Sequence, residues 1–316
     1  MKAVVLGGAG FIGSHLVDAL LKLNVEVTVV DNLSNGHLDN LKQCYDKIKF
    51  IKGDIRDENV LKKAMKKADY AFLLAAKASV PKSWAFPGDF YNVNIEGTHK
   101  VLQIAQDMKV KRVIFSSSSS VYGDQSPGSP KVETMEPRPI SPYALSKRAG
   151  ELLMKMFAKV SDVDTVCLRY FNVYGSRQRF DSPYAAAIPK FCMCALKNEA
   201  PIIYGDGEQS RDFTMVDNVV DGNIKAALCK EALNGEIINI AGGTPITVNK
   251  LWNGIKKMAA AKVDPKYEAE RKGDIKHSDA NPAKAERYIG WKMKVGLKEG
   301  MKRTLDYYKS LGDKNG

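Results

Sequence analysis

The sequence contains few cysteines, and their arrangement argues against both disulfides and metal binding. There are five, an odd number, and none has the paired spacing of a zinc site. Cys192 and Cys194 flank a single residue in a segment that we expect to be helical, which makes them a poor chelating pair. We therefore predict no metal site and expect reduced thiols, which favours an intracellular, cytoplasmic location.

Long apolar runs are also absent. No stretch approaches the roughly 18 residues that a membrane-spanning helix needs. Met1 leads directly into a strand-like segment, without the basic region, apolar stretch and cleavage site of a secretory signal. With 316 residues, 44% of them hydrophobic and 27% charged, we expect one large globular domain or two coupled ones, with no membrane association.

Basic residues exceed acidic ones, 48 against 36, which gives a net charge of +12. The lysines are spread along the whole chain, and those at 61–67 mark the solvated face of a predicted helix. Because no compact basic block is interleaved with aromatic residues, we predict no nucleic-acid partner. A small anionic substrate suits the positive charge equally well.

Residues 2–31 have the pattern of a dinucleotide-binding unit. A strand-like segment at 2–6 is followed at once by Gly7-Gly8-Ala9-Gly10-Phe11-Ile12-Gly13, which matches both G-x-x-G-x-x-G and G-x-G-x-x-G. A leucine-rich helix and a second strand at 25–30, ending at Asp31, complete the unit. The glycines let the backbone approach a pyrophosphate, whose charge is favoured at the N-terminus of the following helix.

Asp31 indicates which dinucleotide is bound. It lies eighteen residues after Gly13, where a carboxylate can accept hydrogen bonds from an adenosine ribose. Its charge would repel a 2′-phosphate, and residues 32–35 include no arginine to receive one. We therefore predict NAD as the cofactor, and an NADPH-dependent reductase is disfavoured.

Strands and helices continue to alternate along the chain. Further strand-like segments lie at 48–51, 69–74, 112–115 and 163–168. This alternation predicts an α/β fold with a Rossmann-like doubly wound parallel sheet. We expect an NAD-binding domain in residues 1–170, with returning segments near 214–241, and a smaller interleaved lobe mainly in residues 171–316.

A serine run and a Tyr/Lys pair come next. The run 116–120 follows a buried strand, so its hydroxyls lie at the edge where open α/β sheets bind ligands. Ser141 is a good N-cap and Pro142 a good first helical residue, which puts Tyr143 and Lys147 one turn apart on one helical face. Taken alone, each piece also fits a flexible loop or an ordinary surface contact.

With these motifs in one chain, the sequence resembles the extended short-chain dehydrogenase/reductases over nearly its whole length. More narrowly it is similar to the nucleotide-sugar 4-epimerases of the UDP-galactose 4-epimerase type. The resemblance implies that Ser118, Tyr143 and Lys147 are catalytic. The motifs and the resemblance together assign to the cofactor Gly7, Gly10, Phe11, Ile12, Gly13, Asp31, Asn32, Ser34, Asn35, Gly36, Asp54, Ile55, Leu74, Ala75, Ala76, Asn94, Ser116, Tyr143, Lys147 and Phe171.

The resemblance also implies a site for a UDP-sugar substrate. The positions assigned to it are Ser79, Ser118, Tyr143, Asn172, Ile203, Tyr204, Arg211, Arg271, Asp274 and Ser278. Among them, Asn172 and Arg211 would hold the diphosphate, and the Arg-x-Gly-Asp type segment 271–274 would close over the nucleotide. Ile203 and Tyr204 would pack against the uracil. Without the family frame, both arginines would be interpreted as surface salt-bridge partners.

The reaction that the resemblance implies is inversion at C4 of the sugar. Tyr143 would act as the general base on the 4-hydroxyl, and Ser118 would hydrogen-bond the same oxygen. Hydride would pass to NAD and return to the opposite face of a 4-keto sugar, so that NAD is regenerated. We expect Lys147 and the positive nicotinamide ring to lower the pKa of Tyr143 from roughly 10.

Three alternatives share part of this pattern. A nucleotide-sugar 4,6-dehydratase is disfavoured, because Ser119 and Ser120 stand where that group has an Asp-Glu pair. A UDP-glucuronate 4-epimerase stays open, because Lys77 or Lys82 could pair with a carboxylate. A non-catalytic NAD-binding protein would have no need of the complete Ser/Tyr/Lys trio.

The resemblance extends to the choice of sugar and to assembly. A small residue at Ser278, where a large aromatic one restricts the pocket, implies acceptance of UDP-GlcNAc and UDP-GalNAc beside UDP-Glc and UDP-Gal. Family members commonly form homodimers through two long helices, here at about 89–108 and 142–158. The apolar residues of the second helix, 152–154, 156 and 157, exceed what one buried face needs and allow such a dimer.

Overall fold

A computed structural model describes residues 1–125, 130–180, 186–270 and 276–312. Its centre is a seven-stranded, all-parallel sheet with the strand order β11-β6-β5-β4-β1-β2-β3. The strands are β1 (Lys2–Leu6), β2 (Glu26–Asp31), β3 (Lys49–Lys52), β4 (Tyr70–Leu73), β5 (Arg112–Ser118), β6 (Asp164–Tyr170) and β11 (Glu236–Ile240).

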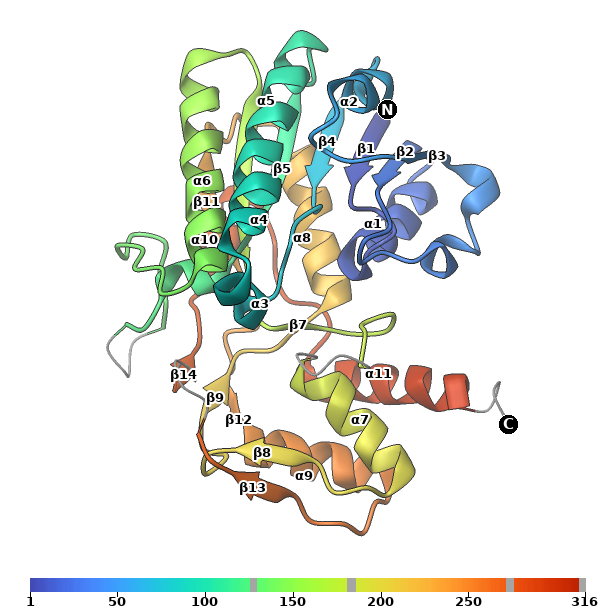
Figure 1. Cartoon of the computed structure of the whole chain (residues 1–316), viewed down its shortest axis with the longest axis vertical. Helices are drawn as coiled ribbons and strands as arrows, with labels where there is room; N and C mark the ends of the chain where they lie inside the picture. The colour runs from blue at the N-terminus through green and yellow to red at the C-terminus, as the bar shows by residue number, and fades with distance from the viewer. Residues whose placement is uncertain (126–129, 181–185, 271–275, 313–316) are drawn as a thin grey trace.

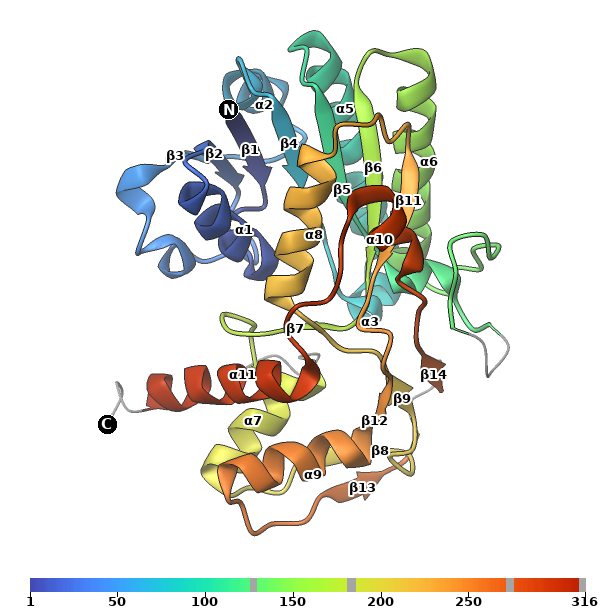
Figure 2. The same ribbon diagram turned by 180° about the vertical axis from the view of Figure 1, so that it is seen from behind.

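Helices cover both faces of this sheet (Figures 1 and 2). One face is covered by α1 (Phe11–Lys22) and α8 (Val216–Leu228), the other by α2 (Glu58–Met65), α5 (Gly97–Asp107) and α6 (Pro142–Val160). Strand β1 shows why two layers form. Its Ala3 and Val5 join the core under α1 and α8, whereas Val4 and Leu6 join the core on the other face, because side chains alternate along a strand. The predicted doubly wound α/β fold is confirmed.

The helix expected at 89–108 consists of three parts. It begins as α4 (Pro87–Tyr91), passes through a π-helical turn at Asn92–Glu96 and continues as α5. Such π turns are rare and often lie at functional sites. Asn94 is buried within this turn.

The lower lobe in Figure 1 contains helices and short strands. Its helices are α7 (Ala187–Lys197), α9 (Val248–Ala259) and α11 (Leu297–Gly312). Its strands pair as β8 (Ile202–Tyr204) with β13 (Lys266–Glu268), and as β12 (Ile246–Thr247) and β14 (His277–Ser278) on either side of β9 (Ser210–Arg211). Strand β7 (Val173–Tyr174) pairs with β10 (Thr214–Met215) where the chain passes between the two parts, and α10 (Ala283–Ile289) lies against β11.

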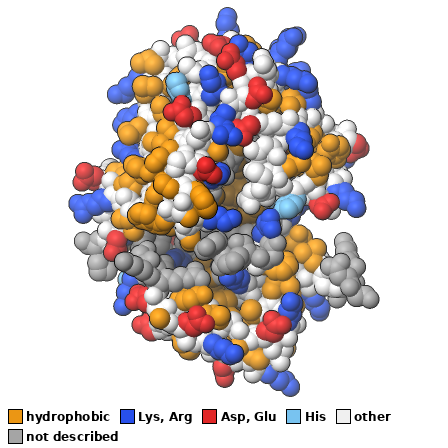
Figure 3. Space-filling model, viewed as in Figure 1, with side chains coloured by type: hydrophobic (Ala, Val, Ile, Leu, Met, Phe, Trp, Pro, Cys, Tyr) orange, Lys and Arg blue, Asp and Glu red, His pale blue; other side chains and the backbone are white. Residues whose placement is uncertain are grey.

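Local sequence signals fix several helix starts. Asp57, Ser141 and Thr247 each accept a hydrogen bond from a main-chain N–H in the first turn of α2, α6 and α9, as N-caps do. Basic side chains are scattered over the face shown in Figure 3 and form no single block there. Among the described residues, no helix is both long and apolar enough to cross a membrane.

Candidate active site

The glycine loop between β1 and α1 forms a cradle that side chains would fill. Gly7 has a φ of +86°, and a Cβ there would lie 2.6 Å from the main-chain nitrogen of Ala75. A Cβ on Gly13 would overlap the carbonyl oxygen of Gly7 and lie 2.8 Å from the Cα of Gly8. Gly10 stands before α1 as an N-cap without a side chain, so no side chain competes for the N–H groups at the start of this helix. The loop therefore fits the pyrophosphate of a dinucleotide.

Asp31 lies at the carboxyl end of β2, beside this cradle. Its side chain is 8% exposed and accepts hydrogen bonds from the N–H of Ala9 at 2.9 Å and of Leu33 at 2.8 Å. Burial raises the pKa of Asp31, and these two hydrogen bonds oppose that shift. A Cβ on Gly36 would lie 2.9 Å from both carboxylate oxygens, so only glycine lets the next loop fold over them. The position fits an acceptor for ribose hydroxyls.

The loops after β2 and β3 meet next to Asp31. The amide of Asn32 donates to Asp54 Oδ2 at 2.9 Å, and its oxygen accepts from the N–H of Ser34 at 3.0 Å. Arg56 binds both oxygens of Asp54 and holds the pKa of that carboxyl at about 2. Two predicted cofactor residues, Asn32 and Asp54, are thus held in direct contact.

The predicted catalytic residues come together where β5 ends. Ser118 is the last residue of β5, and its Oγ accepts hydrogen bonds from the N–H of Ser120 at 3.2 Å and from the Ser120 hydroxyl at 2.9 Å. Tyr143 lies in the first turn of α6 with its hydroxyl near Ser118, which acts on the pKa of the phenol. Lys147 follows one turn later, is 4% exposed, and donates to the main-chain oxygen of Ser116 at 2.8 Å.

Burial has the largest effect on the electrostatics of the Tyr/Lys pair. Burial raises the pKa of Tyr143, and the hydrogen bond from Ser118 only opposes this. Burial lowers the pKa of Lys147 to about 8, from an ordinary 10.5. Without cofactor, burial therefore disfavours the Tyr143 phenolate, and the expected lowering of its pKa by Lys147 and the nicotinamide ring stays a prediction for the complex with NAD.

Asn94 supports the site from behind. Its Oδ1 accepts from the N–H of Lys77 at 2.8 Å, and its amide donates to the Lys77 carbonyl and to Ser146 Oγ, both at 2.9 Å. These bonds hold the loop after β4 against α6. The ammonium of Lys77 pairs with Asp89. The Oγ of Ser79 caps α3 (Val80–Ala85), and Lys82 on that helix is exposed.

Three predicted contact residues have side chains that face the core. Phe171 is fully buried, and Ile55 belongs to the core under α2 and α5. Ile203 is 1% exposed, whereas its neighbour Ile202 is 44% exposed, because alternate residues of β8 face opposite sides. Ile202 therefore shares the outward face of β8 with Tyr204, and the assignment of Ile203 and Tyr204 to the uracil stays a prediction. Main-chain atoms of Phe171, Ile55 and Ile203 are left for ligand contact.

Arg211, predicted for the diphosphate, and Ser278, predicted for the sugar, lie on neighbouring strands of the lower lobe, and Asn172 lies between β6 and β7. Arg211 on β9 is opposite Ser278 on β14, and its guanidinium donates to the carbonyl of Ser210 at 2.9 Å. Arg271 and Asp274 lie outside the described residues.

Asp212 joins these elements and was missed by sequence reasoning. Its buried carboxylate accepts from the N–H of Gly242 at 2.9 Å and of Gly243 at 2.8 Å. Its main-chain N–H donates to the Ser278 carbonyl at 2.7 Å, and its carbonyl accepts from the Asn172 amide at 3.0 Å. Burial raises the pKa of Asp212 to about 6. The signal that could have indicated Asp212 is its position directly after Arg211, which was predicted to hold the diphosphate.

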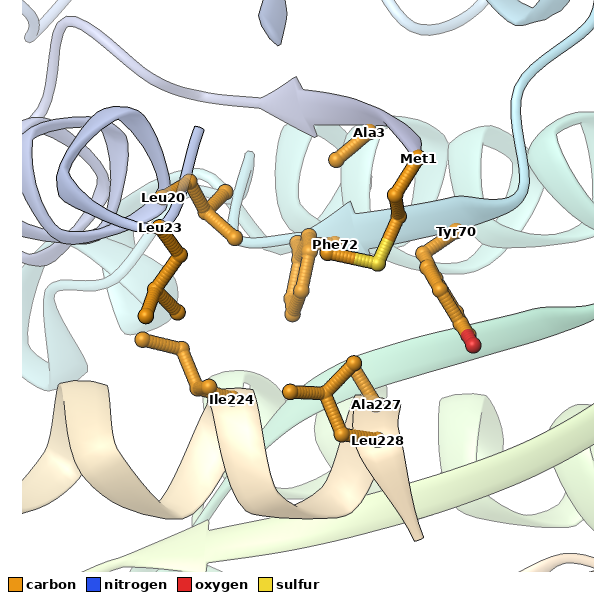
Figure 4. Close-up of a pocket in the computed structure, with 9 residues that line it drawn as sticks. All are labelled: Met1, Ala3, Leu20, Leu23, Tyr70, Phe72, Ile224, Ala227 and Leu228. Atoms are coloured by element: carbon orange, nitrogen blue, oxygen red, sulfur yellow. The ribbon is translucent and has the colours of Figure 1, made fainter. Parts of the chain in front are cut away.

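A second hollow lies at the opposite end of the sheet (Figure 4). It is lined by Met1, Ala3, Tyr70 and Phe72 from β1, β4 and the residue before β1, together with side chains near the ends of α1 and α8. The Tyr70 hydroxyl is the one polar side-chain group among these lining residues. Nothing there suits an anionic dinucleotide or sugar. The described residues also bring together no metal-binding group of three or more His, Cys, Asp or Glu.

Comparison with known proteins agrees with this geometry. The sequence profile of the NAD dependent epimerase/dehydratase family matches residues 3–241. The chain belongs to this family. A putative UDP-glucose 4-epimerase from Methanocaldococcus jannaschii is 36% identical over 310 residues, which cover 97% of this chain and 98% of the relative.

Solved structures extend the match to the whole fold. UDP-glucose 4-epimerase from Thermotoga maritima, with UDP-glucose, has a TM-score of 0.93 at 37% identity and covers 98% of this chain and 99% of that chain. UDP-N-acetylglucosamine 4-epimerase from Methanobrevibacter ruminantium M1, in complex with UDP-N-acetylmuramic acid, has a TM-score of 0.93 at 43% identity and covers 98% of both chains. The predictions of this family, of an enzyme and of NAD as its cofactor are confirmed.

Proposed function

We propose that this enzyme interconverts the C4 epimers of UDP-hexoses. The observation that carries the proposal is the convergence of Ser118, Tyr143 and Lys147 at the carboxyl end of β5, with the glycine cradle and Asp31 at the same edge of the sheet. A phenol close to a serine hydroxyl is suited to bind one sugar hydroxyl together with the serine and to exchange its proton.

Each residue has a distinct task in this reaction. Tyr143 removes the proton from the 4-hydroxyl, and Ser118 hydrogen-bonds the same oxygen. When bound, NAD accepts a hydride from C4 and returns it. Burial raises the pKa of Tyr143. We expect the ammonium of Lys147 and the positive charge of the oxidised nicotinamide to oppose this effect and to favour the Tyr143 phenolate. Tyr143 finally returns the proton to the oxygen, so no net oxidation occurs.

The surroundings of Ser118 favour epimerisation over dehydration. Elimination across C5 and C6 needs an additional acid and base. The two residues after Ser118 are Ser119 and Ser120, and the Ser120 hydroxyl is already engaged with Ser118 Oγ at 2.9 Å. Neither has a group that could serve as that acid or base at neutral pH.

We propose UDP-Glc, UDP-Gal and their N-acetylated counterparts as substrates. Ser278 lies opposite Arg211, which was assigned to the diphosphate, and its small side chain would obstruct an N-acetyl group less than a large aromatic one. UDP-glucuronate is the second candidate. It is less favoured because the Lys77 ammonium already pairs with Asp89, so a substrate carboxylate would have to replace Asp89.

We also propose a homodimer formed through α5 and α6. The α6 residues Leu145, Leu152 and Met156 are exposed at spacings of seven and four, which places them in one stripe. Met154 and Phe157, by contrast, are buried in the core of the same chain. Light scattering coupled to size exclusion, with Leu152→Glu as the disrupting variant, tests this assembly.

The function is tested by incubating the purified protein separately with UDP-Glc, UDP-GlcNAc and UDP-GlcA, without added NAD, and quantifying each C4 epimer by NMR. We expect turnover of the first two and little of the third. Faster turnover of UDP-GlcA would replace the proposed sugar. Silence with every sugar, in protein that still binds NAD, would favour a non-catalytic role.

A further inference from the structure

A buried polar cluster lies directly behind the catalytic serine. Its centre is Glu151, a fully buried residue of α6 one turn beyond Lys147. Glu151 Oε1 accepts hydrogen bonds from Ser117 Oγ at 2.6 Å and Arg169 Nε at 2.7 Å. Its Oε2 accepts from Arg169 Nη2 at 2.8 Å and Arg148 Nη1 at 3.1 Å. The cluster thus joins β5, β6 and α6 through one carboxylate.

The cluster holds the strand that carries the catalytic hydroxyl. Ser117 pairs in register with Arg169, and it stands between Ser116 and Ser118. Because side chains alternate along a strand, Ser117 points to the face opposite to that of its two neighbours. Glu151 can therefore hold the end of β5 through its hydrogen bond with Ser117 without occupying the site in front of Ser118.

The segment after Ser118 is tied to the same cluster. The Arg169 guanidinium stacks on Tyr122, 4.4 Å from the ring centroid, and the Tyr122 hydroxyl donates to Asn239 Oδ1 at 2.7 Å. Tyr122 ends the short 3-10 turn Ser119–Tyr122 that directly follows Ser118. Both sides of the catalytic serine are thus anchored to Glu151, one of them through Arg169.

We propose that Glu151 is a positioning residue of the reaction. By accepting the hydrogen bond from Ser117, it fixes the distance between Ser118 on β5 and the two catalytic residues of its own helix α6, Tyr143 and Lys147. Among the described residues, the hydrogen-bond partners of the Glu151 carboxylate are Ser117, Arg148 and Arg169, none of which was assigned to the substrate or the cofactor. The inference rests on the proposed function, because that function gives Ser118, Tyr143 and Lys147 their roles.

The charge of Glu151 adds a second, electrostatic effect. Burial lowers the pKa of Lys147 to about 8, and the carboxylate of Glu151 opposes this shift. The other titratable group that acts on Lys147 is the thiol of Cys167 on β6, whose own pKa burial raises well above 9.0. Glu151 has the larger of these two effects on Lys147, so removing its charge should lower the Lys147 pKa further.

Two variants separate the effect of the Ser117–Glu151 hydrogen bond from the effect of the Glu151 charge. Ser117→Ala removes one hydroxyl and keeps all the ion pairs, whereas Glu151→Gln keeps the shape and removes the charge. Ser161→Ala is the matched control, because the Ser161 hydroxyl donates to the Phe157 carbonyl at 2.7 Å at the far end of α6. For each, kcat, KM and NAD affinity are measured across pH 6 to 10, and melting checks the fold.

We expect Ser117→Ala to lower kcat about 10- to 100-fold, with KM and NAD affinity nearly unchanged, because a small displacement of a reacting group costs rate more than binding. Glu151→Gln should also move the alkaline limb of the kcat profile to lower pH. Ser161→Ala should match the native enzyme. A folded Ser117→Ala variant with native kcat overturns the proposal.

A measurement without turnover keeps the two proposals distinguishable. The Lys147 pKa is read by NMR titration of ¹³C-labelled lysine, assigned through Lys147→Arg, in native protein and in Glu151→Gln. A lower pKa in the variant supports the electrostatic part even if no sugar is epimerised, and an unchanged pKa overturns it. If Glu151→Gln does not fold, Ser117→Ala decides. If the native enzyme epimerises the sugar and the Ser117→Ala variant has the same kcat, the positioning role is wrong and the proposed function stands.

Discussion

Replacing Asp31 by asparagine should weaken the discrimination between NAD and NADP. In the native protein the buried carboxylate lies at the end of β2, held by the N–H groups of Ala9 and Leu33 at 2.9 and 2.8 Å. A 2′-phosphate on the adenosine ribose would come within about 4 Å of this charge if the ribose hydroxyls occupied hydrogen-bonding distance. Asparagine keeps the shape and one acceptor oxygen but removes the charge.

The size of the effect follows from the charges. Two unit charges about 4 Å apart, at an effective dielectric constant of about 20, repel each other by about 4 kcal/mol. This corresponds to about a thousandfold in affinity. The variant also loses an acceptor for the ribose hydroxyls, worth about 1 kcal/mol. We expect NAD to bind about fivefold more weakly and the preference for NAD over NADP to fall by about a hundredfold to a thousandfold.

Isothermal titration calorimetry with each dinucleotide, on protein freed of bound cofactor, measures both affinities. Asp69→Asn is the matched control, because the Asp69 carboxylate accepts from the N–H of Lys2 at the opposite end of the sheet. It should keep the native ratio. If Asp31→Asn binds NAD and NADP in the native ratio, the electrostatic explanation of cofactor choice is refuted.

Four further outcomes are expected. Tyr143→Phe should lower kcat at least a thousandfold with NAD still bound; a variant with native turnover would remove Tyr143 from the mechanism. Gly13→Ala should weaken NAD binding at least a hundredfold, measured by calorimetry, since its Cβ would overlap the Gly7 carbonyl. As pH rises through about 8, Lys147 loses its ammonium in the free protein, so kcat/KM should fall on the alkaline side; a flat profile to pH 10 would contradict this. Ser278→Tyr should lower kcat/KM for UDP-GlcNAc at least tenfold more than for UDP-Glc; equal losses would place the N-acetyl group elsewhere.

Local signals account for most of what the sequence predicted. Some features depend only on residues that are neighbours in the sequence, so they can be predicted from it. These are the glycine loop, the acid at the end of the second strand and the N-caps at Asp57 and Ser141. The spacing of Tyr143 and Lys147 is likewise a property of a single helix.

Features that depend on burial could not be predicted from the sequence in the same way. Strand β8 has three residues, too few for alternation to reveal its phase, and the inward side chain proved to be Ile203. The pKa of Tyr143 depends on how deeply α6 packs, which no local pattern encodes. Glu151 and Arg169 are far apart in sequence, and each alone resembles an ordinary charged residue until β5, β6 and α6 meet.

The most direct test of the central claim follows the hydrogen at C4. UDP-glucose deuterated at C4 is incubated in water with the purified enzyme, and the UDP-galactose formed is analysed by NMR and mass spectrometry. In the proposed mechanism the hydrogen of C4 moves to bound NAD and back, and Tyr143 exchanges only the hydroxyl proton. We therefore expect the product to retain the deuterium at C4. Loss of the deuterium to water, or inversion at a carbon other than C4, would contradict the mechanism.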